Sequence, residues 1–593
     1  MAAGATFNYL WERRNSRSFD MYMFPISAGM LAGEGLGGVL LALLSVAGVG
    51  ADGVKYGSSV GCTTLGHLVG DMASHEPTSD SQRSRAMSNS SSVSRASSEH
   101  TRRNSPTGEN TDLAEVEKAQ AQGVNPGQEP AKGEQSWEVF LDSSDDPKHR
   151  RGARKWLIVF ILATSSTCVT CASSVAAMAR PGIQKEFGVS SPVAILGISL
   201  YVEGLGIGPL LLGPLSEFFG RRHIYWISFV FFVLLNFPVA FAPNITVYLI
   251  FRFLTGFSGA AFLSVAGGTV ADLFSDDKVA SPMALYTISP FIGPVLGPAF
   301  SGFINQNTNW RWTFYSIIIW AAVQLVELYL LVPETYEPVL RMRKAQQLRK
   351  STGDDRWWAP LEKTDKSIAR TIIASCYKPF EILAFEPMAL LLDIWCALLL
   401  GILYLCFTAF PTIFGVNHGF NTQSVGLSFI GIGIGMLFAL ASQPFWNYLQ
   451  ARYSARHHGA PPPETRLFIG MAGGILVPIG LFWLAFTTPR SVHWIVPIIA
   501  SIPFGTGTVY VFTSVFTFLV VAYRPYAASA MAGNSFLRSA FAAVFPLISG
   551  PMYNRLGTVG ATALLAGLTV LMAPLPFIFY KLGPNLRKNS RFT

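Results

Sequence analysis

The sequence predicts an all-α polytopic membrane protein with two halves of six spans each, and three observations carry this prediction. The 593 residues are 50% hydrophobic and only 13% charged, about half the charged fraction of a typical soluble domain. Roughly twelve apolar segments reach the ~20 residues that a transmembrane helix requires. A long polar stretch, residues 334–387, separates the first six segments from the second six. A composition this apolar indicates a chain that lies in hydrocarbon.

Each expected span is a run of predominantly apolar residues bounded by polar loops. In the first half, residues 151–333, we place spans near 155–179, 193–213, 223–242, 246–271, 281–305 and 313–333. In the second half, residues 388–593 with a short tail, we place them near 388–413, 424–444, 466–487, 493–521, 527–551 and 559–580.

Two further segments precede these spans. Residues 1–62 contain one apolar stretch, 21–50, which is either an additional span or an artefact of the gene model. It is not typical of a cleavable signal peptide, because the apolar run is long and has no clear Ala-x-Ala site. Residues 63–150 are rich in Ser, Arg, Glu and Gln. We expect them to form a disordered cytoplasmic segment without a packing role, because such a composition buries too little surface to fold.

The distribution of basic residues predicts the orientation in the membrane. The net charge of +9 suggests nucleic-acid binding at first sight, but the basic residues lie between the apolar runs instead of on one soluble face. If the 334–387 linker is cytoplasmic, so are Arg151, Arg154, Lys155, Arg221, Arg222, Arg452, Arg456, Arg524, Lys581, Arg587, Lys588 and Arg591. The opposite side has Arg180, Lys185, Arg311, Arg490 and Arg555. Both ends of the twelve-span core are therefore expected in the cytoplasm.

A charged loop between spans two and three is the first motif. Residues 213–222 read Gly-Pro-Leu-Ser-Glu-Phe-Phe-Gly-Arg-Arg, so two glycines allow a tight turn beside two arginines. An ion pair between Arg221 and Asp272 would tie span three to span four, and Glu217 can accept hydrogen bonds from a nearby helix N-terminus. Alternatively, the two arginines only follow the positive-inside rule. The candidate gating latch comprises Gly213, Glu217, Gly220, Arg221, Arg222 and Asp272.

Span five contains the second motif, Ser-Pro-Phe-Ile-Gly-Pro-Val-Leu-Gly-Pro at residues 289–298. Each proline removes a backbone donor and bends the helix, and glycines four residues apart leave one face bare for close packing. Such a helix can act as a pivot whose tight packing limits leakage. Ordinary packing glycines with a tolerated kink are the alternative. The residues of this candidate antiporter helix are Pro290, Gly293, Pro294, Gly297 and Pro298.

These two motifs resemble the loop motif and the antiporter motif of the major facilitator superfamily, over about residues 150–590. The stretches 331–336 (Leu-Val-Pro-Glu-Thr-Tyr) and 349–355 (Arg-Lys-Ser-Thr-Gly-Asp-Asp) are similar to those of fungal twelve-span drug:proton antiporters. The resemblance implies a latch that closes the cytoplasmic side in the outward-facing state, and a span five that goes with antiport. Residues 8–62 resemble instead the C-terminal end of an oligopeptide-transporter-family protein.

Charged residues inside the spans are candidates for proton coupling, because such residues are costly in a membrane. The stretch 252–256 (Arg-Phe-Leu-Thr-Gly) resembles a family motif linked to proton transfer, although Arg252 can also reach the outer interface. Asp393 is the favoured carrier, because Asp-Ile-Trp-Cys resembles the Asp-x-Tyr pattern of the fungal antiporters. Those relatives often have a further acid where this chain has Thr408. The candidates are Arg252, Asp393, Glu203, Glu327 and Arg538. Arg538 would either pair with one of these acids or only hold backbone carbonyls.

Aromatic residues are dense in spans seven and ten, and a pocket lined by them would suit flat apolar or cationic ligands. Packing between helices or against lipid is the alternative for each ring. The pocket candidates are Trp395, Tyr404, Phe407, Tyr510 and Phe512. Cys168 and Cys171 form a Cys-x-x-Cys without a second pair, and no phosphate-binding Walker loop occurs. We therefore expect no metal site and no cofactor other than a proton gradient.

Together, the residues and the resemblance predict a monomeric plasma-membrane transporter and not an enzyme. It would export small hydrophobic or cationic compounds, such as drugs, fungicides or an endogenous toxin, by alternating access driven by proton entry. Its partners would be the substrate, protons and the lipid bilayer, without nucleic acid. Two alternatives stay open, a polyamine or nutrient porter of the same fold and a non-transporting membrane sensor. The sequence does not identify the exported compound.

Overall fold

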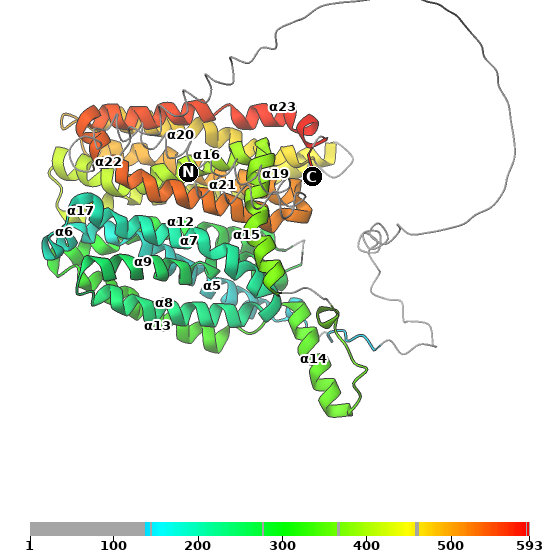
Figure 1. The fold of residues 1–593 in the computed structure, drawn as a ribbon. Coiled ribbons are helices and arrows are strands. Elements are labelled where there is room, and N and C mark those ends of the chain that lie inside the picture. The colour runs from blue at the N-terminus through cyan, green and yellow to red at the C-terminus, as the bar shows by residue number, and fades with distance from the viewer. Residues whose placement is uncertain are drawn as a thin grey trace, which may run out of the picture. The chain divides into compact units, whose positions relative to one another are not determined.

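Long apolar helices make up nearly all of the described part of the chain (Figure 1). The computed structural model describes residues 137–142, 145–275, 278–363, 368–456, 462–588, 590 and 591. Within these ranges the extended backbone is limited to one isolated parallel bridge between Glu138 and Trp358. The all-α fold class is therefore confirmed. The predictions for residues 1–62 and for most of 63–150 lie outside the described residues.

The first half consists of helices that match the six expected spans. A 3-10 turn, Pro147–His149, precedes them. The spans are α5 (Gly152–Ser174) continued by α6 (Ala176–Phe187), α7 (Ser191–Phe219), α8 (Arg221–Ala240), α9 (Ile245–Gly259) continued by α10 (Ala261–Ser264) and α11 (Ala266–Leu273), α12 (Ala280–Asn307) and α13 (Arg311–Leu331). Spans one and four are interrupted, so each is built from consecutive helices instead of one.

The second half repeats this plan. Its helices are α16 (Pro387–Phe410) with a π-helical extension (Pro411–Asn417), α17 (Thr422–Ser428), α18 (Ile430–Ala441), α19 (Gln443–Arg456), α20 (Leu467–Thr487), α21 (Ile495–Ala522), α22 (Ala527–Met572) and α23 (Leu575–Lys588). Short 3-10 turns, Pro463–Arg466 and Arg524–Tyr526, lead into α20 and α22. The α17, α18 and α19 helices together form span eight.

Span eleven and span twelve meet at one residue inside α22. Gly557 has φ 68° and ψ 175°, which no helix contains, and such a left-handed φ suits a residue without Cβ. The continuous apolar stretch Ala527–Lys588 has 62 residues, about three times the ~20 residues that cross a bilayer once. The described residues thus contain eleven apolar stretches of spanning length, and dividing the last at Gly557 gives the expected twelve crossings.

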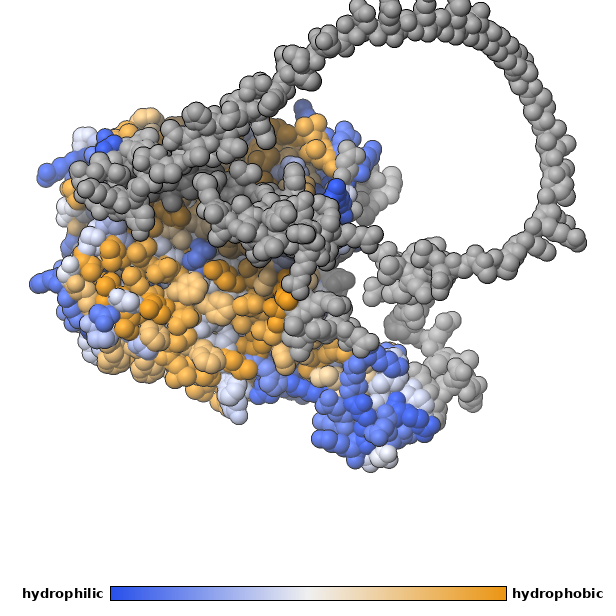
Figure 2. All heavy atoms as spheres, in the orientation of Figure 1, coloured by the Kyte–Doolittle hydropathy of each residue, from blue (hydrophilic) through white to orange (hydrophobic). Residues whose placement is uncertain are grey.

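Apolar side chains cover the outside of the helix bundle, as Figure 2 shows for one face. Many large hydrophobic residues are exposed there, including Phe231, Ile319, Leu330, Phe438 and Leu571. A soluble protein rarely leaves so extensive an apolar surface in water, whereas lipid tails are a suitable solvent for it. The protein is therefore a multi-pass membrane protein.

The polar linker between the halves is also helical. It contains α14 (Glu337–Thr352), a 3-10 turn (Pro360–Glu362) and α15 (Ile368–Phe385). In Figure 1, α14 projects from one end of the bundle, and hydrophilic residues gather over it in Figure 2. We call this end of the bundle, which also bears Arg221 and Arg466, the linker side.

Residues 137–142, just before the first span, pack against the linker. The Val139 amide donates to the Trp358 carbonyl at 3.0 Å, and Val139 forms a small apolar cluster with Ala345 and Ala359. Lys344 Nζ lies 2.5 Å from Asp142 Oδ2. The expectation that the whole of residues 63–150 has no packing role is thus wrong for its last part. The apolar run Val139-Phe140-Leu141 within this polar segment could have indicated the contact.

Candidate functional site

A cavity of about 1230 Å³ lies between the two halves. Its walls come from α5, α7, α11 and α12 of the first half and from α16, α18 to α22 of the second. The lining reaches the linker-side ends of these helices, where it includes Glu217, Arg221, Gln450 and Arg466. The cavity therefore extends to the linker side of the bundle.

On the side away from the linker, the two halves are in direct contact. A Cβ added at Gly426 of α17 would overlap the Pro298 carbonyl of α12, and one added at Gly302 would lie 2.9 Å from the Thr422 carbonyl oxygen. Nearer the middle, Ser199 Oγ of α7 donates to the Ala543 carbonyl of α22 at 2.5 Å. Contacts this close leave no passage between these helices, so the structure has one open side and one closed side.

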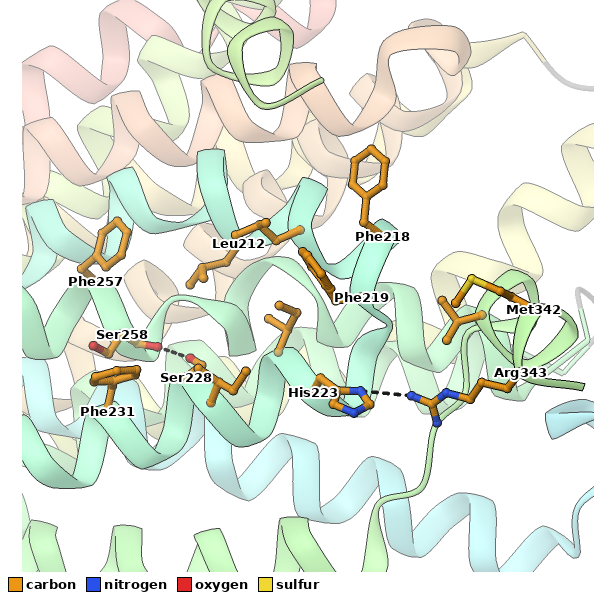
Figure 3. A pocket seen from close by; sticks show the side chains of 14 residues that line it. Leu212, Phe218, Phe219, His223, Ser228, Phe231, Phe257, Ser258, Met342 and Arg343 are labelled. Atoms are coloured by element: carbon orange, nitrogen blue, oxygen red, sulfur yellow. Dashed lines mark hydrogen bonds between the residues drawn. The ribbon is translucent and has the colours of Figure 1, made fainter. Parts of the chain in front are cut away.

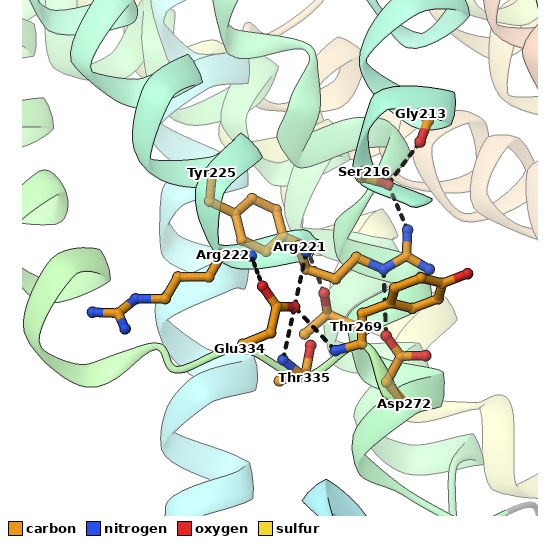
Figure 4. Close-up of polar contacts among 10 residues, drawn as sticks. Gly213, Ser216, Arg221, Arg222, Tyr225, Thr269, Asp272, Glu334 and Thr335 are labelled. Atoms are coloured by element: carbon orange, nitrogen blue, oxygen red, sulfur yellow. Dashed lines mark hydrogen bonds and ion pairs between the residues drawn. The ribbon is translucent and has the colours of Figure 1, made fainter. Parts of the chain in front are cut away.

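Arg221 and Asp272 lie together at the linker side of the first half (Figure 4). Arg221 Nε is 3.3 Å from Asp272 Oδ2, and Arg221 Nη1 donates to Ser216 Oγ at 2.6 Å. The guanidinium also lies over the Tyr336 ring, 4.7 Å from its centroid. The contact that the sequence predicts is present, but its members all belong to one half. It cannot by itself hold the two halves together.

Glu334, which the sequence reasoning did not assign to the site, organises the start of α8. Its Oε1 accepts from the backbone amide of Arg221 at 2.9 Å and its Oε2 from that of Arg222 at 3.2 Å. The amides of Thr335 and Tyr336 also donate to Oε1, both at 3.0 Å. The carboxylate thus satisfies the free N–H groups of a helix N-terminus, where negative charge is favoured.

Glycine at position 220 makes this cap possible. Gly220 has φ 89°, and a Cβ there would overlap Glu334 Oε2. The signal in the sequence is the Pro-Glu-Thr-Tyr run that follows span six. The capping role predicted for Glu217 belongs to Glu334 instead. Glu217 is exposed at the mouth of the cavity and has no hydrogen-bond or ion-pair partner among the described residues, and Arg222 donates outward to the Tyr329 carbonyl. Gly213 lines the cavity mouth.

The glycines of the candidate antiporter helix pack against α5. A Cβ at Gly293 would overlap Thr170 Oγ1, and one at Gly297 would overlap Ser174 Oγ. Pro290 and Pro294 instead line the cavity, and Pro298 faces α17 of the other half. Because α12 contacts both its own half and the opposite one, it occupies the position that a pivot would need.

Arg252 is fully buried between α5, α7 and α9. Its guanidinium donates to the carbonyls of Gly197 and Ala172 at 2.8 Å and of Ser173 at 3.2 Å. It also lies over the Tyr201 ring at 4.3 Å. The Ala172 and Ser173 carbonyls lie just before the interruption at Val175, where helical donors are missing. The alternative in which Arg252 reaches the outer interface is therefore wrong, and no carboxylate lies within ion-pair distance of it in the described residues.

The three acids inside the spans have different surroundings. Asp393 is 1% exposed, and Asn534 Nδ2 of α22 donates to its Oδ1 at 2.8 Å. Glu327 accepts from Gln324 at 2.7 Å, and Gln324 in turn accepts from Ser165, so this acid belongs to a polar contact between α13 and α5. Glu203 is half-buried on α7, without a hydrogen bond or ion pair among the described residues.

Arg538 lies one helical turn after Asn534 on α22 and lines the cavity. Asp393 is not within ion-pair distance of it: the ion pairs of the described residues do not include Arg538, and Asp393 is bonded to Asn534. The two side chains therefore do not form the predicted ion pair in this structure, and Arg538 has no hydrogen bond to a backbone carbonyl among the described residues either. The guanidinium lies over the rings of Phe516 and Phe512, at 4.9 and 5.6 Å from their centroids.

Of the five aromatic pocket candidates, only Tyr404 lines the cavity, and its hydroxyl bonds Ser173 Oγ at 2.8 Å. Trp395 packs on the glycines of α20, Phe407 on Phe429, Tyr510 on Trp446, and Phe512 on Phe291. Packing is thus the correct interpretation for these four rings. The aromatic residues that do line the cavity are Tyr286, Phe291, Tyr404, Trp446, Tyr453, Phe468 and Phe516.

A second hollow, of about 610 Å³, lies outside the central cavity, between α7, α8, α9 and α14 (Figure 3). Its walls are mainly apolar, with phenylalanines along them, and His223 and Arg343 share a hydrogen bond at its linker end. The hollow opens on the apolar outer surface of one half, away from Arg538 and Asp393. Its place and lining suit lipid chains.

A search for metal ligands among the described residues finds no group of three or more His, Cys, Asp or Glu side chains that could hold an ion. Cys168 and Cys171 are buried in α5 as free thiols.

Comparison with known proteins agrees with this architecture. The sequence pattern of the Major Facilitator Superfamily matches residues 162–546. The chain belongs to this superfamily. It is 48% identical over 470 residues to "Efflux pump atB" of Aspergillus terreus, a match that covers 78% of this chain and 91% of that protein. It is 40% identical over 467 residues to "Probable drug/proton antiporter YHK8" of Saccharomyces cerevisiae, with 78% and 91% covered.

Solved structures of superfamily members share the fold. The human organic anion transporter MFSD10 is 17% identical, with a TM-score of 0.52, and the match covers 72% of this chain and 100% of that one. An inward-open, partially occluded form of the xylose transporter XylE from E. coli is 16% identical, with a TM-score of 0.50, and covers 72% and 99%. The resemblance to the fungal drug:proton antiporter group of the superfamily is thus confirmed by the curated relatives.

Proposed function

We propose that this protein exports small, largely apolar compounds across the plasma membrane by alternating access, driven by proton entry. The observation that carries the proposal is the central cavity of about 1230 Å³, open at the linker side and closed at the other. Its volume exceeds the ~300–1,000 Å³ of common ligand pockets. Names of similar proteins, an efflux pump and a drug/proton antiporter, support the direction of transport.

Asp393 is the acid that we propose as the proton carrier. It is buried between α16 and α22 at a hydrogen bond from Asn534, and α22 also forms a wall of the cavity. A movement of α22 that accompanies substrate release would therefore alter the surroundings of this carboxyl. Glu327 accepts a hydrogen bond from Gln324 on α13, and Arg252 donates to backbone carbonyls. We therefore do not propose either residue as the proton carrier.

The linker side is the side that we propose to face the cytoplasm. The basic residues of both halves gather there, with Arg221, Arg466 and Arg587 among them, and cytoplasmic loops of membrane proteins are rich in such residues. An export cycle then begins in the state seen here, in which the cavity is reached from inside the cell. No bound cofactor is required, because the proton gradient supplies the energy.

An efflux assay with a controlled gradient tests the proposal. Purified protein in liposomes should move an apolar dye against its gradient when a pH difference is imposed, and a protonophore should abolish this movement. Uptake in the direction opposite to export would favour a nutrient or polyamine porter. Dye movement that is equal with and without protein would instead favour a non-transporting sensor.

A further inference from the structure

Arg538 is a charged side chain in the cavity wall that forms no ion pair or hydrogen bond with the described residues. It lies eleven residues after the start of α22, or ~16 Å along a helix that rises 1.5 Å per residue. This depth is about half of the ~30 Å hydrocarbon layer. Its Nε is shielded from solvent and has no hydrogen-bond partner. Among the described residues no ion pair or hydrogen bond neutralises this guanidinium, although an unpaired buried charge is costly.

Asp393, an embedded acid on the neighbouring helix α16, forms no ion pair with Arg538. Asp393 is bonded to Asn534, one turn before Arg538 on the same helix. The other two embedded arginines with described contacts are satisfied, since Arg252 binds three carbonyls and Arg221 binds Asp272. Arg538 therefore differs from both, because its donors have no hydrogen-bond partner among the described residues.

The charged residues that line the cavity have an excess of positive charge. They are Glu217, Arg221, Arg466 and Arg538. Glu217 and Arg221 lie at the mouth, and Arg466 donates to Gln450 on the linker side. No acid therefore faces the inner end of the described cavity lining, where a cationic compound would meet only Arg538. The sequence analysis expected hydrophobic or cationic substrates. The excess of positive charge in the cavity disfavours the cationic ones.

The guanidinium of Arg538 lies over the ring of Phe516, and Phe516 also lines the cavity. Phe512 lies behind it and stacks on both Phe516 and Phe291. Ser535 and Ser539, at i−3 and i+1 from Arg538, line the same wall. An aromatic platform beside a fixed cation and hydroxyl groups can hold a flat ring that carries an anionic group.

We propose that the protein takes aromatic organic acids as substrates, with the carboxylate bound by Arg538 and the ring against Phe516. The proposal rests on the exporter function proposed above and specifies its substrate class. An arginine fork matches a carboxylate in two parallel hydrogen bonds, and such charge-assisted bonds are stronger than neutral ones. Binding of the carboxylate would also neutralise the Arg538 guanidinium, which forms no ion pair with the described residues.

Three compounds with one ring system test the proposal: 2-naphthoate, neutral 2-naphthamide and cationic 2-naphthylmethylammonium. Their dissociation constants are measured by calorimetry with the full-length protein in lipid nanodiscs. We expect 2-naphthoate to bind at least about tenfold more tightly than the amide, because a hydrogen bond to a charged group contributes more than a neutral one. The ammonium compound should bind most weakly.

Three variants test whether Arg538 is the residue that gives the preference for the carboxylate. Arg538→Gln should weaken 2-naphthoate binding at least about tenfold and leave the amide unchanged, whereas Arg538→Lys should keep part of the preference, because it retains the charge without the fork. Arg452→Gln removes the same charge from an exposed position on α19 and should change none of the three constants. If Arg538→Gln does not fold, the wild-type comparison and the lysine variant still decide the question.

Equal binding of the carboxylate and the amide by the wild-type protein would overturn the inference, as would an Arg538→Gln variant that keeps the preference. If either result is found while a pH difference still drives export of an apolar dye, only the substrate class is wrong. If none of the three compounds binds and no dye is exported, the exporter function fails together with it.

Discussion

Three arginines inside the helix bundle have three different environments, and the environment decides what each can do. Arg252 is surrounded by carbonyl oxygens, so its charge braces the interrupted first span. Arg221 binds Asp272 at the linker side. Arg538 lies over two aromatic rings and forms no ion pair among the described residues. The sequence places all three in or beside spans but does not distinguish them, because the partners come from helices distant along the chain.

Arg221→Ala should reduce export at least about tenfold while surface expression stays largely intact. The side chain fixes the start of α8 on α11, next to the loop that bears Glu217, and its loss would shift the balance between the open states by more than ~1.4 kcal/mol. A partly exposed ion pair contributes little to folding. Efflux and surface labelling in the same cells measure both quantities. Arg452→Ala, at an exposed position on α19, is the matched control, and wild-type efflux by the Arg221 variant would refute the latch role.

Asp393→Asn should block export driven by a pH difference. The amide keeps the size of the side chain and can still bond Asn534, but it cannot take up and release a proton. Exchange of labelled for unlabelled substrate without a gradient should persist, because exchange needs the binding site and no net proton movement. Glu203→Gln serves as the comparison. Normal pumping by the Asp393 variant, with failure of the Glu203 variant, would assign the carrier to α7.

At the scale of the element, the glycines and the prolines of α12 face different neighbours. The glycines face α5, where the bare backbone approaches within contact distance, and two prolines face the cavity. Spacing in the sequence predicts the bare face, because residues four apart share one side of a helix. It does not predict which neighbour the face meets.

Gly293→Ala should destabilise the protein by ~1–3 kcal/mol, the usual cost of overpacking a filled interior. The added methyl group overlaps Thr170 Oγ1, and α5 has no space to retreat because Arg252 holds its carbonyls. Gly567→Ala is the control, since nothing lies within 4 Å of a Cβ there. Thermal unfolding in detergent should show a lower midpoint for the first variant only. Equal midpoints would mean that the contact between α5 and α12 is loose.

For the whole molecule, the linker side is open while the Arg221–Asp272 pair is formed. Because both residues belong to one half, the pair can act on the second half only through the neighbouring loop that bears Glu217. What must change is the contact between halves, and Glu217 is the member of the latch that faces the opening. Closing the linker side would bring its free carboxylate towards the second half.

Two truncations test the segment that precedes the first span. Deleting residues 1–136 should leave membrane insertion and efflux unchanged, because the core's own basic loops set its orientation. Deleting residues 1–145 also removes Val139 and Asp142 from their contacts with the linker. This second deletion should speed tryptic cleavage within α14 several-fold, as expected when local packing is lost. Equal cleavage of both truncated proteins would show that this packing does not protect α14.

The sequence by itself determined the twelve crossings, the two halves and the two motifs, because hydrophobic length and glycine spacing are local properties. Even the junction at Gly557 lies between two predicted spans. Only the tertiary structure decided which partners the buried charges have. Glu334 and not Glu217 caps α8. Among the described residues Arg538 forms no ion pair with an acid, and four of the five predicted pocket rings pack between helices. Side chains on helices far apart in the chain meet through the packing of the bundle, and local periodicity does not encode that packing.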